Sequence, residues 1–214
     1  MTIPTALRRS GKEFVFTFSY GDIISGTGFV TFLGLKAGSG GVYRLDPSNK
    51  ISSQPTQTQG THSGASLQEV HDIDFDITFN RTVTLKGETI INVPIFFSET
   101  NTNASRDIYC IAKVRHVDSG ATETDIFTGG QSSTNDHTHN TYLMYACVPD
   151  ITQKTFKQGE TLRLSISVFV QGGAAGDTGA CNISHNPINI AAGWDTTGAV
   201  PSHLLFQVPT RIVE

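Results

Sequence analysis

The stretch Thr161-Leu-Arg-Leu-Ser-Ile-Ser-Val-Phe-Val170 alternates apolar and polar side chains with a period of two. Leu162, Leu164 and Ile166 fall on one face of an extended chain, and Arg163 falls on the other. A β-strand that buries one face has this period, whereas a helix repeats every 3.6 residues. The stretch therefore predicts a strand with one face in a core.

The same alternation recurs along the chain and predicts an all-β protein. Strands are expected near residues 13–19, 28–35, 41–45, 72–79, 89–97, 107–117, 141–149, 161–171 and 203–213. No segment shows convincing helical periodicity, and no apolar run is long enough to predict a membrane span. A length of 214 residues suits one large β-domain. We predict an antiparallel jelly-roll-like β-sandwich over residues 13–214, preceded by an N-terminal arm over residues 1–12.

Three features of the strand pattern carry further expectations. Long polar or glycine-rich segments at 46–70, 118–140 and 171–202 are predicted as loops that make contacts. Pro94 and Pro209 fall inside strand patterns, and we expect them at an edge or a bulge because proline donates no backbone hydrogen bond. The segment 141–149 is apolar on both faces, which predicts a central strand or one covered by another subunit.

The composition excludes some partners and favours others. The formal net charge is −4 and the charged fraction is 16%, below the roughly 25% of typical domains. This balance gives no basic footprint for nucleic acid. Uncharged polar surfaces can meet other protein surfaces without charge repulsion. The first residues lack the apolar core of a signal peptide, so we expect synthesis in a cytoplasm.

Two clusters are candidates for metal binding. In an extended segment, His137 and His139 would point the same way, and with Asp136 they could bind zinc or another transition metal. The alternative is a polar loop tip. A second cluster shares one face of a predicted strand and either binds calcium or forms a solvated face: Asp72, Asp74 and Asp76.

Catalytic signatures are missing from the sequence. There is no G-x-S-x-G elbow, no H-E-x-x-H zinc motif, no P-loop and no dinucleotide fingerprint. We therefore predict a protein that is not an enzyme, with no cofactor apart from the candidate metal ion. Trp194, the only tryptophan, lies in a glycine-rich segment, where it either stacks on a sugar ring or anchors a loop on the core.

The last third of the chain has a recognisable order of motifs. It begins with Phe156-Lys-Gln-Gly-Glu-Thr-Leu-Arg-Leu, continues through His185-Asn-Pro, and closes on Pro209-Thr-Arg-Ile. Residues 156–213 thereby resemble the endings of jelly-roll structural proteins from the virions of environmental tailed viruses. A threonine stands at position 210, where those proteins usually have an aromatic residue. The resemblance implies a capsid, decoration or fibre-type subunit located in the virion, without catalytic residues.

These observations predict a structural virion protein that assembles with itself, as a trimer by analogy with other viral sandwiches, and with other virion proteins. Neither nucleic acid nor membrane is expected as a partner. The expected contact residues lie in loops and on the outer face of the 141–149 strand: His137, His139, His185, Trp194, Tyr142 and Met144. The alternatives are a carbohydrate- or receptor-binding sandwich and, ranked last, a jelly-roll metal enzyme.

Overall fold

The computed structural model describes residues 27–36, 42–47, 57–101, 105–174, 176–185 and 204–211. The predicted arm over 1–12, the predicted strand over 13–19 and Trp194 lie outside these ranges. Within them the chain forms strands and turns, and no helix is long and apolar enough to cross a membrane. The predicted all-β fold is confirmed.

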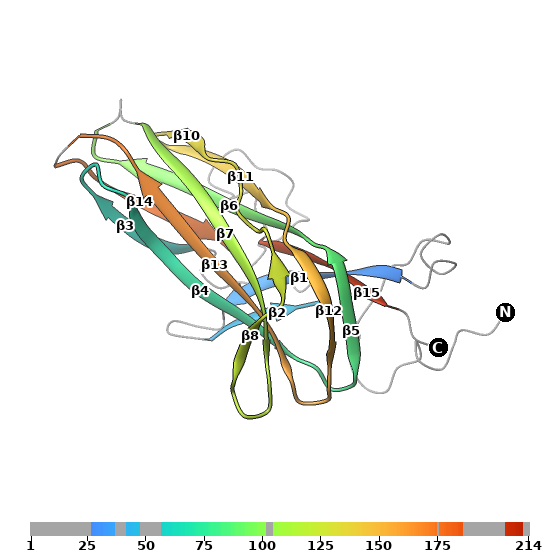
Figure 1. Cartoon of the computed structure of the whole chain (residues 1–214). Helices are drawn as coiled ribbons and strands as arrows, with labels where there is room; N and C mark the ends of the chain where they lie inside the picture. The colour runs from blue at the N-terminus through green and yellow to red at the C-terminus, as the bar shows by residue number, and fades with distance from the viewer. Residues whose placement is uncertain are drawn as a thin grey trace, which may run out of the picture.

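The described residues form one sheet of fifteen strands that folds over itself (Figure 1). The strands are β1 (Thr27–Lys36), β2 (Tyr43–Asp46), β3 (Gln57–Ser63), β4 (Gln68–Thr78), β5 (Val83–Glu88), β6 (Ile90–Glu99), β7 (Ser105–Val117), β8 (Glu123–Asp125), β9 (Phe127–Thr128), β10 (Asn135–Thr138), β11 (Thr141–Cys147), β12 (Asp150–Phe156), β13 (Thr161–Gln171), β14 (Thr178–Ser184) and β15 (Leu205–Arg211).

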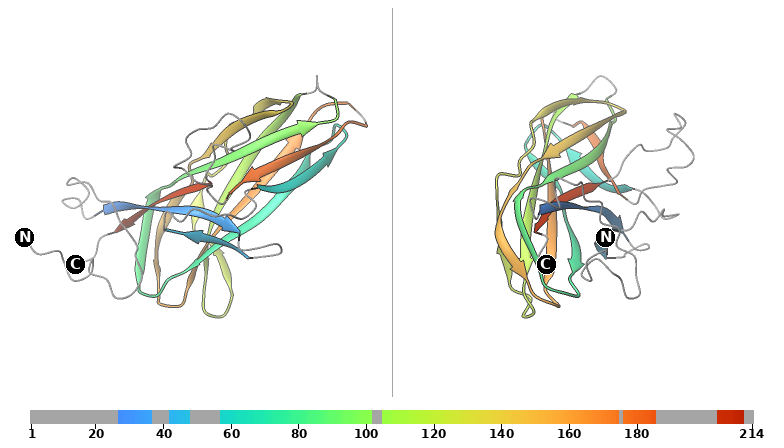
Figure 2. Two further views of the ribbon diagram at one scale, coloured as in Figure 1. Left: turned by 180° about the vertical axis from the view of Figure 1, so that it is seen from behind. Right: turned by 90° about the vertical axis from the view of Figure 1, so that its right-hand side faces the viewer.

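Two layers face each other across the core. One layer has the order β4–β13–β7, with β8 and β10 beside β7. The other has the order β3–β14–β6–β11, and the left view of Figure 2 turns it toward the viewer. At the far end, β5 pairs with β12, and β15 lies between β1 and the β5–β6 segment. All the pairings are antiparallel except one bridge between Arg44 and Asp76.

The alternating strands supply the core as the sequence predicts. On β13, Leu162, Leu164, Ile166 and Val168 are fully buried. This strand pairs with β4 on one side and β7 on the other, so it is a central strand. Alternate residues of β6 face it across the interior, and with those of the neighbouring β7 they complete one continuous apolar cluster.

The prediction of three long loops is partly wrong, because each of these segments contains at least one strand. They contain β3, β8, β9, β10 and β14. The inward positions of β3 hold Thr58, Gly60 and His62, so the sequence lacks the apolar alternation that would predict a strand there. Pairing with β14 fixes this segment as a strand, because the partner satisfies its backbone donors and acceptors.

The two prolines lie inside the sheet, so the prediction of an edge or bulge is wrong. Strand β6 pairs with β14 over residues 95–99 and with β15 over residues 90–92, and Pro94 falls between these two partners. Strand β15 pairs with β6 over residues 205–207 and with β5 at Thr210, and Pro209 falls between them. The hydrogen-bonded ladder to one partner ends where the next partner begins. A proline at that position, which lacks the N–H donor, therefore breaks no inter-strand hydrogen bond.

Candidate functional site

The most distinctive surface is a row of exposed, uncharged side chains along β11 and the residue after it, called here the β11 strip: Tyr142, Met144, Ala146 and Val148. Tyr142 is 43% exposed, Met144 50% and Val148 49%, whereas the alternate residues Tyr145 and Cys147 are buried in the core. The strand is therefore neither central nor covered by described residues. The remaining expectation for segment 141–149, cover by another subunit, is taken up below.

Strand β6 holds the β11 strip in place from one side. Tyr142 lies opposite Phe96 in the register, with ring centroids 4.6 Å apart, and Met144 lies opposite Pro94. On its other side, β11 pairs with no strand among the described residues. A free strand edge that carries apolar side chains and no charge usually marks an interaction surface, because natural proteins protect exposed edges with charges, prolines or bulges.

The absence of charge extends over the whole outer face of the layer. Each outward position on its four strands is apolar or a neutral polar residue, and we call this set the uncharged face: Tyr142, Met144, Ala146, Val148, Ile90, Asn92, Pro94, Phe96, Ser98, Thr178, Ala180, Asn182, Gln59, Thr61 and Ser63. Rows run straight across it, for example from Ser98 through Ala180 to Thr61.

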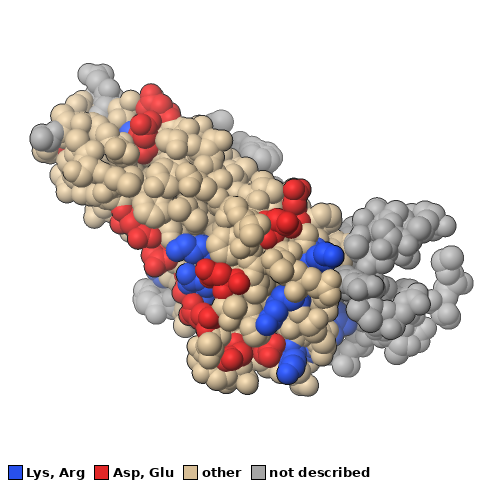
Figure 3. Space-filling model, viewed as in Figure 1, with Lys and Arg blue, Asp and Glu red and all other residues tan. Residues whose placement is uncertain are grey.

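The outer face of the opposite layer is charged. Arg163 donates to both carboxylate oxygens of Asp76 at 2.8 and 2.7 Å and lies 3.3 Å from Asp74. These hydrogen bonds raise the pKa of Arg163. Arg115 pairs with Asp125 at 2.9 Å and with Glu123 at 3.2 Å. Figure 3 shows such charges gathered over the lower half of this face.

The predicted calcium cluster lies on this charged face. Two of its members, Asp74 and Asp76, contact Arg163, and Ser165 donates to Asp74 as well. The guanidinium group therefore already neutralises the carboxylates, which favours the solvated face over a calcium site. Among the described residues, no group of three histidine, cysteine or acidic side chains could hold a metal ion.

The candidate metal ligands from β10 have other partners. His137 is fully buried, and its Nε2 donates to the carbonyl oxygen of Thr141 at 3.0 Å, while the Tyr145 hydroxyl donates to its Nδ1 at 3.3 Å. Burial lowers the pKa of His137, so the ring is neutral at pH 7. His139 uses its Nδ1 to accept from the backbone N–H of Glu99 at 2.9 Å. Asp136 is exposed, and these arrangements give the metal prediction no support.

A buried ion pair that the sequence reading missed lies at the same end of the sandwich. Arg106 and Glu99 have fully buried side chains, and Nε of Arg106 lies 3.0 and 3.1 Å from the two carboxylate oxygens of Glu99. Nη1 of Arg106 donates to the carbonyl oxygen of Gly64 at 2.6 Å. The pair thus ties the ends of β6 and β7 to the turn after β3.

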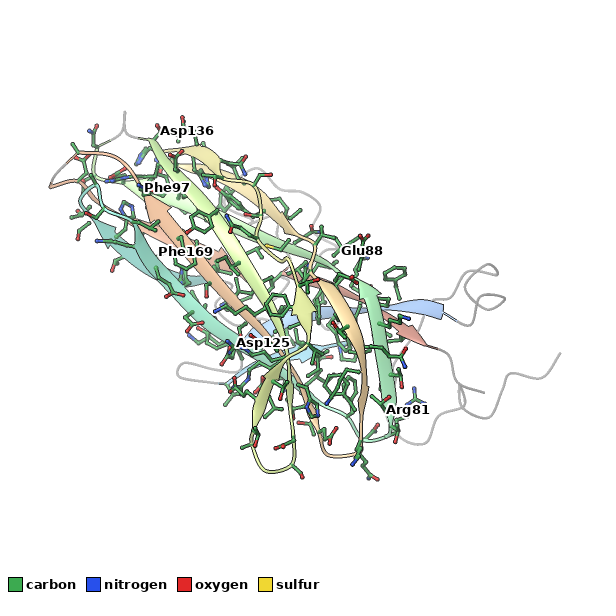
Figure 4. All side chains as sticks on the ribbon, viewed as in Figure 1. Arg81, Glu88, Phe97, Asp125, Asp136 and Phe169 are labelled. Atoms are coloured by element: carbon green, nitrogen blue, oxygen red, sulfur yellow. The ribbon has the colours of Figure 1, made fainter. Side chains whose placement is uncertain are left out.

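Two buried histidines flank one phenyl ring close to this pair. The ring centroid of Phe97 lies 5.4 Å from that of His62 and 5.5 Å from that of His137. Figure 4 places Phe97 and Asp136 at this end of the molecule. Neither ring nitrogen of His62 has a hydrogen-bond partner in the described structure. Burial, and then the charge of Arg106, lower the pKa of His62.

His185 is also a core residue, although it was expected to make contacts. It is 1% exposed, its Nε2 lies 2.8 Å from the hydroxyl of Thr58, and its ring packs edge-on against Tyr43 and Phe75. Of the expected contact residues that the structure describes, Tyr142 and Met144 are the two that present large exposed surfaces.

Comparison with known proteins gives a fold and no family. No protein-family model and no curated protein matches the chain. The chain is similar to a solved aminopeptidase from the marine sediment archaeon Thaumarchaeota archaeon, with a TM-score of 0.53 and 6% identity over 87% of this chain and 37% of that chain. A CocE/NonD family hydrolase from Staphylococcus aureus has a TM-score of 0.49 and 15% identity over 86% of this chain and 36% of that chain. A structure of infectious bursal disease virus, Gx strain, has a TM-score of 0.28 and 10% identity over 87% of this chain and 37% of that chain.

These matches correct one prediction. The chain spans little more than a third of each of these longer chains, and at such identities the likeness to the aminopeptidase shows the fold alone. The prediction that the chain is not an enzyme is corrected, because a solved enzyme, the aminopeptidase, shares this fold. The resemblance to virion proteins has a much weaker counterpart in the virus structures.

Proposed function

We propose that this chain is a structural β-sandwich subunit that assembles with copies of itself through the uncharged face, as part of a virion. The observation that carries the proposal is the β11 strip, an apolar row on a free strand edge. The similarity of residues 156–213 to virion jelly-roll proteins supports the location in a virion.

The contrast between the two outer faces supports an assembly role. One layer covers its outer face with paired arginines and acids, which remain well hydrated in water. The other leaves large apolar side chains exposed and places no charge among them. Interfaces between proteins are depleted of charged residues at their centre, and they are enriched in tyrosine, phenylalanine and methionine. Tyr142, Phe96 and Met144 fit this composition.

The solution mass of the purified chain, measured by light scattering at neutral pH with and without EDTA, tests the proposal. We expect a stable multiple of the 23.1 kDa chain in both conditions, and the predicted trimer is one such assembly. Met144→Lys should shift the mass toward the monomer, because it places a charge in the contact. The matched control Gln153→Lys, at an exposed position on β12, should leave the mass unchanged. A monomeric wild type at every concentration would overturn the proposal.

A second candidate follows from the aminopeptidase match. The chain would then be a sandwich domain that works beside a catalytic unit, as its coverage of 37% of that enzyme allows. Incubation of the purified chain with leucine p-nitroanilide and with p-nitrophenyl acetate tests whether it has activity of its own. Because catalysis belongs to another unit in this candidate, no turnover is expected, and a monomeric mass in light scattering would favour it over the structural subunit. Turnover that is lost on heat denaturation would place a catalytic site in the chain itself and contradict both candidates.

A further inference from the structure

An aromatic pair lies on the outer face of the charged layer. Tyr109 on β7 is opposite Phe169 on β13, and the two rings are stacked, with centroids 4.9 Å apart and planes inclined by 10°. Their neighbours Cys110 and Val168 are fully buried, so alternation turns both aromatic rings outward, where they are partly exposed. The ring faces that the stack leaves open can receive a cation, most often the guanidinium group of arginine.

Four exposed carboxylates surround this pair, and none of them has an ion-pair partner among the described residues. We call the aromatic pair and these acids the acidic platform: Tyr109, Phe169, Glu69, Asp72, Asp107 and Asp136. The nearest basic residue of β7 on this face is Lys113, about 14 Å from Tyr109 along the strand. Figure 3 shows the lysines and arginines over the lower half of this face and acidic side chains at its upper end.

Two details of the acidic platform indicate a missing cationic partner. Asp107 and Asp136 are directly opposite each other on β7 and β10, and like charges in this position destabilise a sheet. Ser167 lies on the same face as Phe169 and opposite Asp72. It is 1% exposed, and its hydroxyl has no hydrogen-bond partner in the described structure. An arginine that enters beside it would neutralise the acids and offer the hydroxyl a donor.

The first twelve residues of the chain supply such a group. They contain Arg8, Arg9 and Lys12 and no acidic residue, in a chain whose formal net charge is −4. A guanidinium group suits the platform better than an ammonium group does, because it stacks flat on an aromatic ring and also donates to carboxylates. The adjacent Arg8 and Arg9 therefore match the platform in both charge and shape.

We propose that the acidic platform of one copy binds Arg8 and Arg9 of a neighbouring copy. This inference rests on the proposed self-assembly and adds a second contact to the one made by the uncharged face. The arm and the platform are two different patches, so this contact runs head to tail, which allows a ring such as the predicted trimer.

The position of β1 favours a neighbour over the same copy. Thr27, the first residue of β1, pairs with Arg211 at the β5 end of the sandwich, whereas the platform lies at the β10 end (Figure 1). An arm bound to its own platform would have to run along the sandwich and around to the other layer. Residues 10–26 span at most about 60 Å when fully extended, which is enough to reach an adjoining copy.

Charge reversal on both sides tests which groups meet. The arm variant Arg8→Glu/Arg9→Glu and the platform variant Asp107→Lys/Asp136→Lys each bring like charges together. Each should raise the dissociation constant of the assembly at least about tenfold, measured by light scattering over a dilution series. An equimolar mixture of the two variants should recover assembly, because every arm then finds a platform of opposite charge. Added salt should weaken the recovered assembly.

Two further variants complete the test. Gln153→Lys/Gln158→Lys adds positive charge at exposed positions on β12 and the turn after it, and should keep the wild-type dissociation constant. Asp107→Asn/Asp136→Asn removes the acids without reversing them and should weaken assembly less than the lysine variant does. An assembly that tolerates the arm variant, or a mixture that stays dissociated, would overturn the arm contact and leave self-assembly standing. A wild type that is monomeric at every concentration would overturn both proposals.

Discussion

Replacement of Arg106 by methionine should lower the free energy of unfolding by about 3–5 kcal/mol. The side chains of Arg106 and Glu99 are fully buried, so the substitution leaves a carboxylate inside the sandwich without its counter-charge. It also removes the donor to the carbonyl oxygen of Gly64. For a domain of this size, each kcal/mol corresponds to roughly 2–4 °C in the midpoint of thermal unfolding, so we expect a drop of about 6–20 °C.

A double variant shows whether the unpaired carboxylate of Glu99 causes this loss of stability. Glu99→Leu combined with Arg106→Met removes both charges and should recover most of the stability, because well-packed apolar residues often replace a buried ion pair without loss. Urea unfolding of the wild type, both single variants and the double variant completes a double-mutant cycle. A loss below about 1 kcal/mol in Arg106→Met would refute the reasoning, since that is the usual value of an exposed pair. Single losses that simply add in the double variant would refute it as well.

Three further results are expected. Gly173→Ala should destabilise more than Gly176→Ala: both glycines have positive φ, but a Cβ at Gly173 would displace Arg106, whereas Gly176 faces open space; urea unfolding compares the two. Stability should fall as the pH drops below about 6.5, by at most about 1.4 kcal/mol per pH unit for each of His62, His71 and His137. Burial lowers the pKa of these histidines, so the unfolded chain binds protons that the folded chain does not. His62→Leu should flatten the slope in unfolding curves measured below about pH 6.5. The cysteines should resist iodoacetamide at pH 8 until urea unfolds the chain, since all three are buried and burial raises the pKa of Cys147 to about 11 and that of Cys181 to about 12.

The strands that were predicted correctly have large apolar residues at every second position. Strand β13 was predicted over its exact range because Leu162, Leu164 and Ile166 mark its buried face. Strand β14 was missed because its inward positions include only Cys181 and Ile183, and β3 was missed because its inward positions hold small or polar residues. Such segments become strands through pairing with a neighbour, and a single sequence does not display that partner.

The site was predictable in part. Alternation placed Tyr142 and Met144 on the outer face of their strand, and the structure exposes both. The buried ion pair left a signal that was not used: Glu99 continues the buried series of β6 and Arg106 begins that of β7, so opposite charges stand on the inward faces of two strands. The hollow of about 580 Å³ over the ends of β3, β14 and β6 could not be predicted from the sequence, because it depends on which small residues become neighbours across these three strands.

The place of β15 between β1 and the β5–β6 segment has a consequence for biosynthesis. A ribosome delivers residues 205–211 after every other described strand, so β1 and part of β6 lack this neighbour until β15 has been synthesised. Pairings between residues so far apart in the chain form slowly, and unpaired edges attract other nascent chains. A chaperone that shields these edges, or a low temperature during expression, should therefore raise the yield of soluble protein.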